Sequence, residues 1–124
     1  IMLDIDHFKA VNDNFGHIVG DEVLKEISLI IKSSIRIIDT AGRWGGEECM
    51  IILPESDIKG GQIVAEKMRL KIEENQFPHV GKLTASFGVS EYKSEMSENE
   101  LVTRADNAMY KAKNAGRNRV CIHE

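Results

Sequence analysis

Residues 43–48 read Arg-Trp-Gly-Gly-Glu-Glu, and the apolar run Met-Ile-Ile-Leu follows at 50–53. Adjacent glycines permit a tight hairpin with a positive φ, and without a Cβ they let another group approach the backbone closely. Carboxylates on such a turn do not serve a hydrophobic core. The stretch therefore predicts a β-hairpin that carries Glu47 and Glu48, although solvated hairpins often show the same pattern.

Two other charged clusters make this hairpin informative. Residues 4–6, Asp-Ile-Asp, follow an alternating apolar run, and Lys113 and Arg117 form a basic pair near the C-terminus. Magnesium typically takes one or two protein carboxylates together with substrate phosphates. Two acidic clusters and a basic pair therefore predict a metal–triphosphate site. Its candidate ligands are Asp4, the backbone carbonyl of Ile5 and Glu47.

The composition is that of an ordinary globular domain, with 124 residues, of which 42% are hydrophobic and 29% charged. A net charge of −4 argues against nucleic acid as a partner. Cys49 and Cys121 lack the spacing of a zinc site or a disulfide framework. We expect one domain over residues 1–124, in the cytoplasm or in the cytoplasmic part of a membrane-attached protein. Because the chain opens inside a strand pattern, we also expect a missing upstream part with a sensory or regulatory domain.

Periodicity predicts an α+β domain in the order β-α-β-β-α-β-α-β. Asp57 and the capping box at 97–100 predict the starts of two helices, whereas Gly16 and Gly116 predict helix ends. A further helix is expected to open at residues 20–22, Gly-Asp-Glu. The expected strands are 1–5, 39–44, 49–53, 83–92 and 120–122, and the other expected helices are 8–15, 57–74 and the segment after 97.

The two aspartates of the first cluster receive different interpretations. Asp4 is expected to be a metal ligand, whereas Asp6 is expected to cap the helix that begins at Phe8. An EF-hand does not fit, because Phe8 and Lys9 occupy positions that need an oxygen donor and a glycine. The chain has no GxxxxGK[ST] motif, so its sequence does not predict a P-loop.

Arg36 and Asp39, spaced three residues apart, allow two interpretations. An arginine fork can read the O6 and N7 edge of guanine, and a carboxylate can accept from its N1–H and amino group. One helical turn would place the two side chains on the same face. Taken alone, the spacing favours a solvated ion pair worth about 0.2–0.5 kcal/mol.

Taken together, these motifs resemble the GGDEF family of diguanylate cyclases. The matching segments stand in the family's order and spacing over essentially the whole chain, at residues 4–9, 12–13, 15–17, 20–21, 43–48, 86–89, 104–106 and 110–118. The resemblance implies a mixed β-sheet of the nucleotide-cyclase or polymerase-palm type. An antiparallel hairpin with Gly-Gly-Glu-Glu would sit in that sheet, flanked by helices, and the N-terminal part of the family domain would be absent.

The resemblance also implies a function, the joining of two GTP molecules into cyclic di-GMP with loss of two pyrophosphates. It implies a homodimer with one GTP and one Mg²⁺ or Mn²⁺ site per subunit. The implied metal ligands are Asp4, the Ile5 carbonyl and Glu47, with Glu48 assisting deprotonation of the attacking hydroxyl. The implied GTP-binding residues are His7, Phe8, Lys9, Lys113 and Arg117 for the triphosphate and Asn12 and Asp21 for guanine. An inhibitory cyclic di-GMP site would use Arg36 and Asp39, with Lys67 of the partner subunit.

Three departures from the family pattern leave alternatives open. Cys49 replaces the usual aromatic residue of the motif and is expected to be a packing position, and Glu47 replaces aspartate with the same ligand chemistry. The upstream Leu-Thr-Gly-Leu and Asn-Arg motifs are absent. The alternative functions are a catalytically inactive domain that senses GTP or cyclic di-GMP through partner proteins, and a cyclase with adenine-containing products. Asp21 disfavours the second, because its carboxylate suits the donor edge of guanine.

Overall fold

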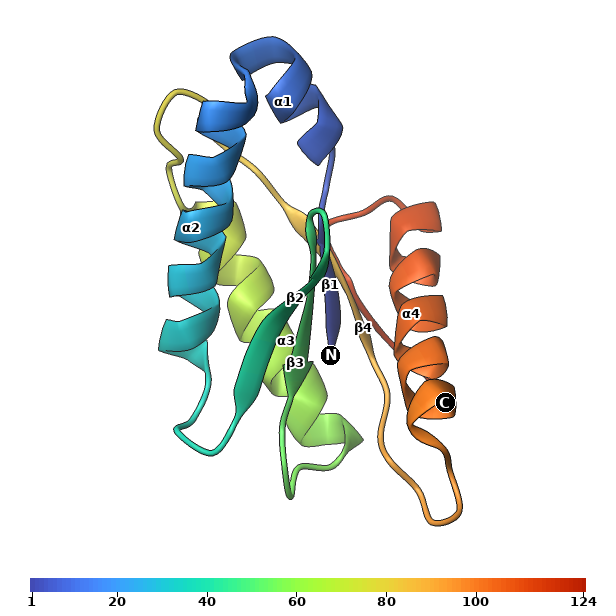
Figure 1. The fold of residues 1–124 in the computed structure, drawn as a ribbon. Coiled ribbons are helices and arrows are strands. Elements are labelled where there is room, and N and C mark those ends of the chain that lie inside the picture. Colours follow the sequence, from blue (N-terminus) through green and yellow to red (C-terminus); the bar gives the residue numbers. More distant parts are fainter.

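The computed structural model describes residues 1–124 and contains one five-stranded sheet (Figure 1). The strands lie in the order β2-β3-β1-β4-β5, and all neighbouring pairs are antiparallel except β4 and β5. The mixed sheet with an antiparallel hairpin confirms the predicted fold class. The strands are β1 (Met2–Ile5), β2 (Thr40–Gly45), β3 (Glu48–Ile52), β4 (Ala85–Val89) and β5 (Val120–Ile122).

Helices α2 and α3 lie on one side of this sheet and α4 on the other, while α1 lies beyond the end of β1 (Figure 1). Alternate residues of β1 point to opposite faces, so Leu3 and Ile5 join the main core while Met2 packs with Ala105 and Met109 of α4. Asp4 follows Met2 by two residues and therefore faces α4. The helices are α1 (Phe8–Phe15), α2 (His17–Ser34), α3 (Ile58–Glu74) and α4 (Glu98–Asn114).

Most of the predicted helix ends are confirmed by the cap geometry. Asp57 accepts a hydrogen bond from the Gly60 amide at 2.8 Å, and Ser97 accepts one from the Glu100 amide at 3.1 Å. Gly16 ends α1 with φ +87°. None of the helices has the length and apolar character needed to span a membrane.

Two elements differ from the sequence-based prediction by more than one residue at an end. The helix expected to open at Gly20 begins at His17, with Gly16 as its N-cap. Gly20 lies inside α2, where a Cβ would overlap the Oδ1 atom of Asn12 on α1. The glycine therefore lets the Asn12 side chain lie close against α2, and it does not mark a helix start. The strand expected over 83–92 forms only from Ala85 to Val89.

Gly88 sets the distance between α4 and the sheet. A Cβ at this position would overlap the carbonyl oxygen of Ala105 and the backbone nitrogen of Met109. Backbone atoms cannot move aside as a flexible side chain can, so α4 packs directly against the β4 backbone.

We expect Gly88→Ala to lower the free energy of unfolding by about 1–3 kcal/mol or more, because it overpacks this contact. Urea unfolding followed by circular dichroism measures the change. Gly42→Ala in β2 is the matched control, since a Cβ there meets nothing within 4 Å. The free energy of unfolding of this control should stay within about 0.5 kcal/mol of that of the parent chain. Equal stability of the two variants would contradict this account of α4 packing.

Candidate active site at the end of β1

The glycine turn forms the two-residue connection between β2 and β3. Gly45 pairs with Glu48, so Gly46 and Glu47 make the turn, and Gly46 has φ +46°. A register shift between Arg43 and Gly45 produces a bulge just before it. The Nε atom of Arg43 donates to the Gly46 carbonyl at 2.9 Å and so braces the turn from its own strand. The predicted hairpin is confirmed, and the positive φ falls on its second glycine.

The acidic end of β1 lies directly beside this hairpin. Asp4 is the register partner of Glu48 in the antiparallel β1–β3 pair. Directly paired residues present their side chains on the same face of a sheet, about 4.5–5.5 Å apart at Cβ. The structure therefore brings together the two acidic segments that the sequence separates by more than forty residues.

Asp4 is buried, with 4% of its surface exposed, and Lys113 of α4 contacts its carboxylate. Burial raises the pKa of the Asp4 carboxyl, and Lys113 lowers it in part, while the negative charges of Glu47 and Asp6 raise it further. Burial likewise raises the pKa of Glu48, with contributions from Asp4 and from Asp106 on α4. The site thus carries an excess of closely spaced negative charge.

The acidic groups suit a hard cation that shares its coordination with a ligand. The chain contains no cluster of three or more His, Cys, Asp or Glu side chains that could hold a metal ion. Magnesium commonly takes one or two carboxylates and completes its octahedron with phosphates and water. Asp4, Glu47 and the Ile5 carbonyl fit that pattern, and Asp106 is a nearby acidic residue that the sequence did not indicate.

Asp6 does not cap α1, so that prediction is wrong. Its carboxylate accepts hydrogen bonds from Thr84 Oγ1 at 2.7 Å, Ser86 Oγ at 2.6 Å and the Asn118 backbone amide at 3.0 Å. The N-cap of α1 is His7, which has φ +57° and makes no side-chain cap. Neutral donors satisfy Asp6, and they come from Thr84 just before β4, from Ser86 in β4 and from the segment after α4, so Asp6 joins three parts of the chain.

The residues expected to bind a triphosphate lie at the same end of the sheet as Asp4. His7, Phe8 and Lys9 form the start of α1, where no side chain caps the helix and the Ala10 amide donates to the His7 carbonyl at 3.0 Å. Amides at a helix start favour anions. Lys113 ends near Asp4, and Arg117 follows Gly116, which has φ +122° and confirms the predicted helix end.

The residues expected to read guanine lie where α1 meets α2. Asn12 is half-buried, and its Oδ1 atom packs against Gly20. Asp21 is the next residue along α2 and is exposed. Asn12 on α1 therefore packs against the residue that precedes Asp21 on α2.

Arg36 and Asp39 form an ion pair at 2.8 Å, but not on a helix. Helix α2 ends at Ser34, and the pair closes the turn before β2, where the Arg36 amide also donates to Asp39. The helical placement is therefore wrong, although the two side chains do meet. Arg36 lowers the pKa of Asp39 and also donates to the Pro54 carbonyl and Ser56 Oγ. Lys67 is exposed on α3.

Cys49 lies in the main hydrophobic core and pairs with Leu3 of β1. This confirms the interpretation of Cys49 as a packing position. Its side chain faces the opposite side of the sheet from Asp4 and Glu48, since neighbouring strand residues alternate. The departure from the family motif therefore does not enter the acidic site.

A mixed sheet with acidic groups at the end of β1 and on the adjacent hairpin agrees with the nucleotide-cyclase type that the resemblance implies. The family model described as "Diguanylate cyclase, GGDEF domain" matches residues 1–119, and the chain belongs to this family. The diguanylate cyclase A of Treponema denticola is 44% identical over 98% of this chain and 34% of its own length. The chain thus spans about a third of that relative.

Two solved structures show the same fold. The active GGEEF domain of a diguanylate cyclase from Vibrio cholerae has a TM-score of 0.93 and 37% identity, over 99% of this chain and 80% of that one. The GGDEF domain of DgcB from Caulobacter crescentus, solved in complex with c-di-GMP, has a TM-score of 0.94 and 34% identity. The match covers 98% of this chain and 75% of that one.

We expect Asp4→Asn to unfold at a Tm equal to or above that of the parent chain in EDTA at pH 7. Folding raises the pKa of the Asp4 carboxyl, so the folded protein loses stability as the pH rises above the pKa that this carboxyl has in the unfolded chain. The ionised form of Asp4 is therefore unfavourable to the fold at neutral pH. The difference in Tm should narrow as the pH falls through the raised pKa of the folded state, because Asp4 is then protonated and carries no charge, as asparagine does.

Asp6→Asn is the matched control, because its carboxylate accepts three hydrogen bonds. The Asp6→Asn variant should lose about 1–3 kcal/mol of its free energy of unfolding, since the new amide NH₂ would face one of the hydrogen-bond donors that now bind the carboxylate. Thermal unfolding by circular dichroism compares the two. A lower Tm for Asp4→Asn than for Asp6→Asn at pH 7 would contradict the charge argument.

Proposed function

We propose that this domain is a diguanylate cyclase that condenses two GTP molecules into cyclic di-GMP and two pyrophosphates. One observation carries the proposal, namely the pairing of Asp4 with Glu48 beside the Gly46–Glu47 turn. Family membership and the active GGEEF domain of Vibrio cholerae support the same chemistry.

Asp4, the Ile5 carbonyl and Glu47 would hold Mg²⁺ or Mn²⁺. The hard oxygen donors and the raised pKa of Asp4 fit a divalent cation that relieves the local negative charge. When bound, the ion would lower the pKa of the attacking ribose 3′-hydroxyl and offset charge on the α-phosphate. Glu48 would accept the proton of that hydroxyl, a role that the raised pKa of its carboxyl favours.

The remaining residues would position the nucleotide. The amides at His7, Phe8 and Lys9 would bind phosphate oxygens together with the side chains of Lys113 and Arg117. Asn12 and Asp21 would read guanine at the junction of α1 and α2. Holding the reacting groups in line accounts for much of the barrier in such a displacement.

Each subunit offers one such site, so catalysis requires two subunits with their GTP molecules face to face. The 3′-hydroxyl of each nucleotide then attacks the α-phosphate of the other. The rate per subunit therefore rises with protein concentration until the dimer is saturated. An upstream sensory or regulatory domain would control this dimerisation, with the cyclase domain itself in the cytoplasm.

Product inhibition would act through Arg36 and Asp39, with Lys67 of the partner subunit as a helper. Arg36 is half exposed, with 51% of its side chain accessible, whereas that of Asp39 is 1% accessible. The guanidinium is therefore the group that can turn toward a guanine edge. The DgcB domain solved with c-di-GMP supports binding of this product within the family.

A non-enzymatic sensor of GTP or cyclic di-GMP is the second candidate. Only Cys49 favoured it in the sequence, and Cys49 packs in the core away from the acidic groups. The cyclase therefore remains the better proposal. Tight nucleotide binding without turnover at high protein concentration would select the sensor instead.

We expect Glu47→Gln to lower turnover of GTP with Mg²⁺ by at least about 100-fold while the fold stays intact, because it removes a carboxylate ligand. Cyclic di-GMP formation measured by chromatography, together with circular dichroism, tests both parts. Glu74→Gln on the exposed end of α3 is the matched control and should keep full activity. Normal turnover in Glu47→Gln would disprove the metal assignment.

Arg36→Ala should keep its initial rate and lose inhibition by added cyclic di-GMP. The change removes the exposed half of the ion pair and leaves the acidic site untouched. Initial rates at increasing product concentration measure the effect, with Arg104→Ala, a partly exposed arginine on α4, as the control. If product inhibits Arg36→Ala and the parent chain equally, the inhibitory site lies elsewhere.

A further inference from the structure

The turn that follows α4 has an unusual backbone. Gly116, Arg117 and Asn118 have φ of +122°, +64° and +47° in succession. A left-handed conformation costs a non-glycine residue roughly 1–2 kcal/mol, with asparagine among the more tolerant. Two such residues in a row require the surrounding structure to hold them.

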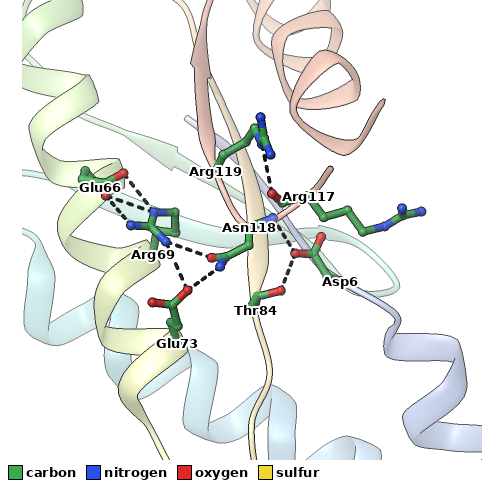
Figure 2. Close-up of polar contacts among 8 residues, drawn as sticks. All are labelled: Asp6, Glu66, Arg69, Glu73, Thr84, Arg117, Asn118 and Arg119. Atoms are coloured by element: carbon green, nitrogen blue, oxygen red, sulfur yellow. Dashed lines mark hydrogen bonds and ion pairs between the residues drawn. The ribbon is translucent and has the colours of Figure 1, made fainter. Parts of the chain in front are cut away.

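Asn118 is held on three sides (Figure 2). Its backbone amide donates to Asp6 at 3.0 Å, and its Oδ1 accepts from Arg69 of α3 at 2.9 Å. Its Nδ2 donates to the carboxylate of Glu73, also on α3. One side chain therefore uses both its donor and its acceptor, which fixes the orientation of its amide and the register of the turn.

Arg69 is the centre of this network. Its side chain is only 16% exposed, and its Nε donates to both carboxylate oxygens of Glu66 at 3.0 Å. A second ion pair reaches Glu73 at 3.4 Å. The guanidinium is thus immobilised by two carboxylates before it meets Asn118, and a rigid donor can define the position of its acceptor.

Arg117 lies on the other side of the same turn. Figure 2 shows its side chain pointing away from α3 and from Arg69, while Asn118 points toward them. The Arg117 amide donates to the Ala112 carbonyl at 3.0 Å, and its carbonyl accepts from Arg119 Nε at 3.1 Å. With both backbone groups paired and φ fixed, the direction of the Arg117 Cα–Cβ bond is set by the turn.

We propose that Arg69 is a positioning residue for nucleotide phosphates, because through Asn118 it fixes the direction in which Arg117 points. Arg69 does not touch the nucleotide and acts only through the turn. This inference rests on the proposed function, in which Arg117 binds the triphosphate. It adds a link from α3, on the opposite face of the sheet, to the phosphate end of the site.

A double-mutant cycle tests the link. Arg69→Met should weaken GTP binding in the presence of Mg²⁺ by about tenfold, a size typical of coupled side chains. Arg117→Ala should weaken it at least as much, and the double variant should bind GTP no more weakly than Arg117→Ala alone. Isothermal titration calorimetry gives the affinities, and urea unfolding confirms that each variant is folded.

Guanosine, which lacks phosphates, separates positioning from a general loss of structure. Its affinity should be the same in Arg69→Met as in the parent chain, since no hydrogen bond or ion pair joins Asn12 or Asp21 to the turn. Asn118→Asp should reproduce the loss for GTP, because a second carboxylate would face Glu73. This variant also serves in place of Arg69→Met if the latter does not fold.

The outcomes distinguish this inference from the proposed function. The positioning role alone would be overturned if the losses of GTP affinity in Arg69→Met and Arg117→Ala added up in the double variant. It would also be overturned if Arg69→Met lost affinity for GTP and for guanosine equally. Unchanged GTP binding in both Arg69→Met and Asn118→Asp while Arg117→Ala is impaired would have the same consequence. A parent chain that binds no GTP would overturn the proposed function and the positioning role together.

Discussion

The register between β1 and β3 is the constraint on which the candidate site depends. Leu3 pairs with Cys49 on the core face, and this pairing places Asp4 opposite Glu48 on the face toward α4. A slip of one residue would turn Glu48 into the core and expose the apolar side chains of β3. The hydrophobic core therefore selects the position of the acidic groups, although it contains none of them.

Two aspartates in one short segment show how environment separates structural from chemical roles. Asp6 accepts three hydrogen bonds from neutral donors, so its carboxylate is fully used in joining β1 to β4 and to the turn after α4. Asp4 is equally buried but meets one lysine and several carboxylates. Its unfavourable charge is what a cation can relieve, so the site retains a capacity for binding at some expense in stability.

The sequence predicts features whose causes are local, and it fails where the cause is remote. Helix caps at Asp57 and Ser97 and the glycine turn follow from neighbouring residues, and all three are confirmed. The Asp6 interpretation failed because its donors lie 78 or more positions along the chain. Gly20 resembled a helix start because its real partner, Asn12, lies on another helix. The positions of Asp4 and Glu47 came from combining motifs, since neither segment alone indicates a site.

Strand β4 connects the helices on the two faces of the sheet, because α3 and α4 both approach it at positions where side chains are small. Gly88 admits the backbone of α4 on one face, and Gly61 of α3 faces Val89 on the other, where a Cβ would again be crowded. These contacts fix two helices that otherwise pack in different apolar clusters, α3 in the main core and α4 against Met2. Helix α4 carries Lys113, and α3 carries Arg69, which holds Asn118 and hence the turn that bears Arg117. The direction of two basic side chains at the phosphate end therefore depends on how closely one strand can be approached from both sides. A change in either glycine would alter their geometry without touching the acidic residues.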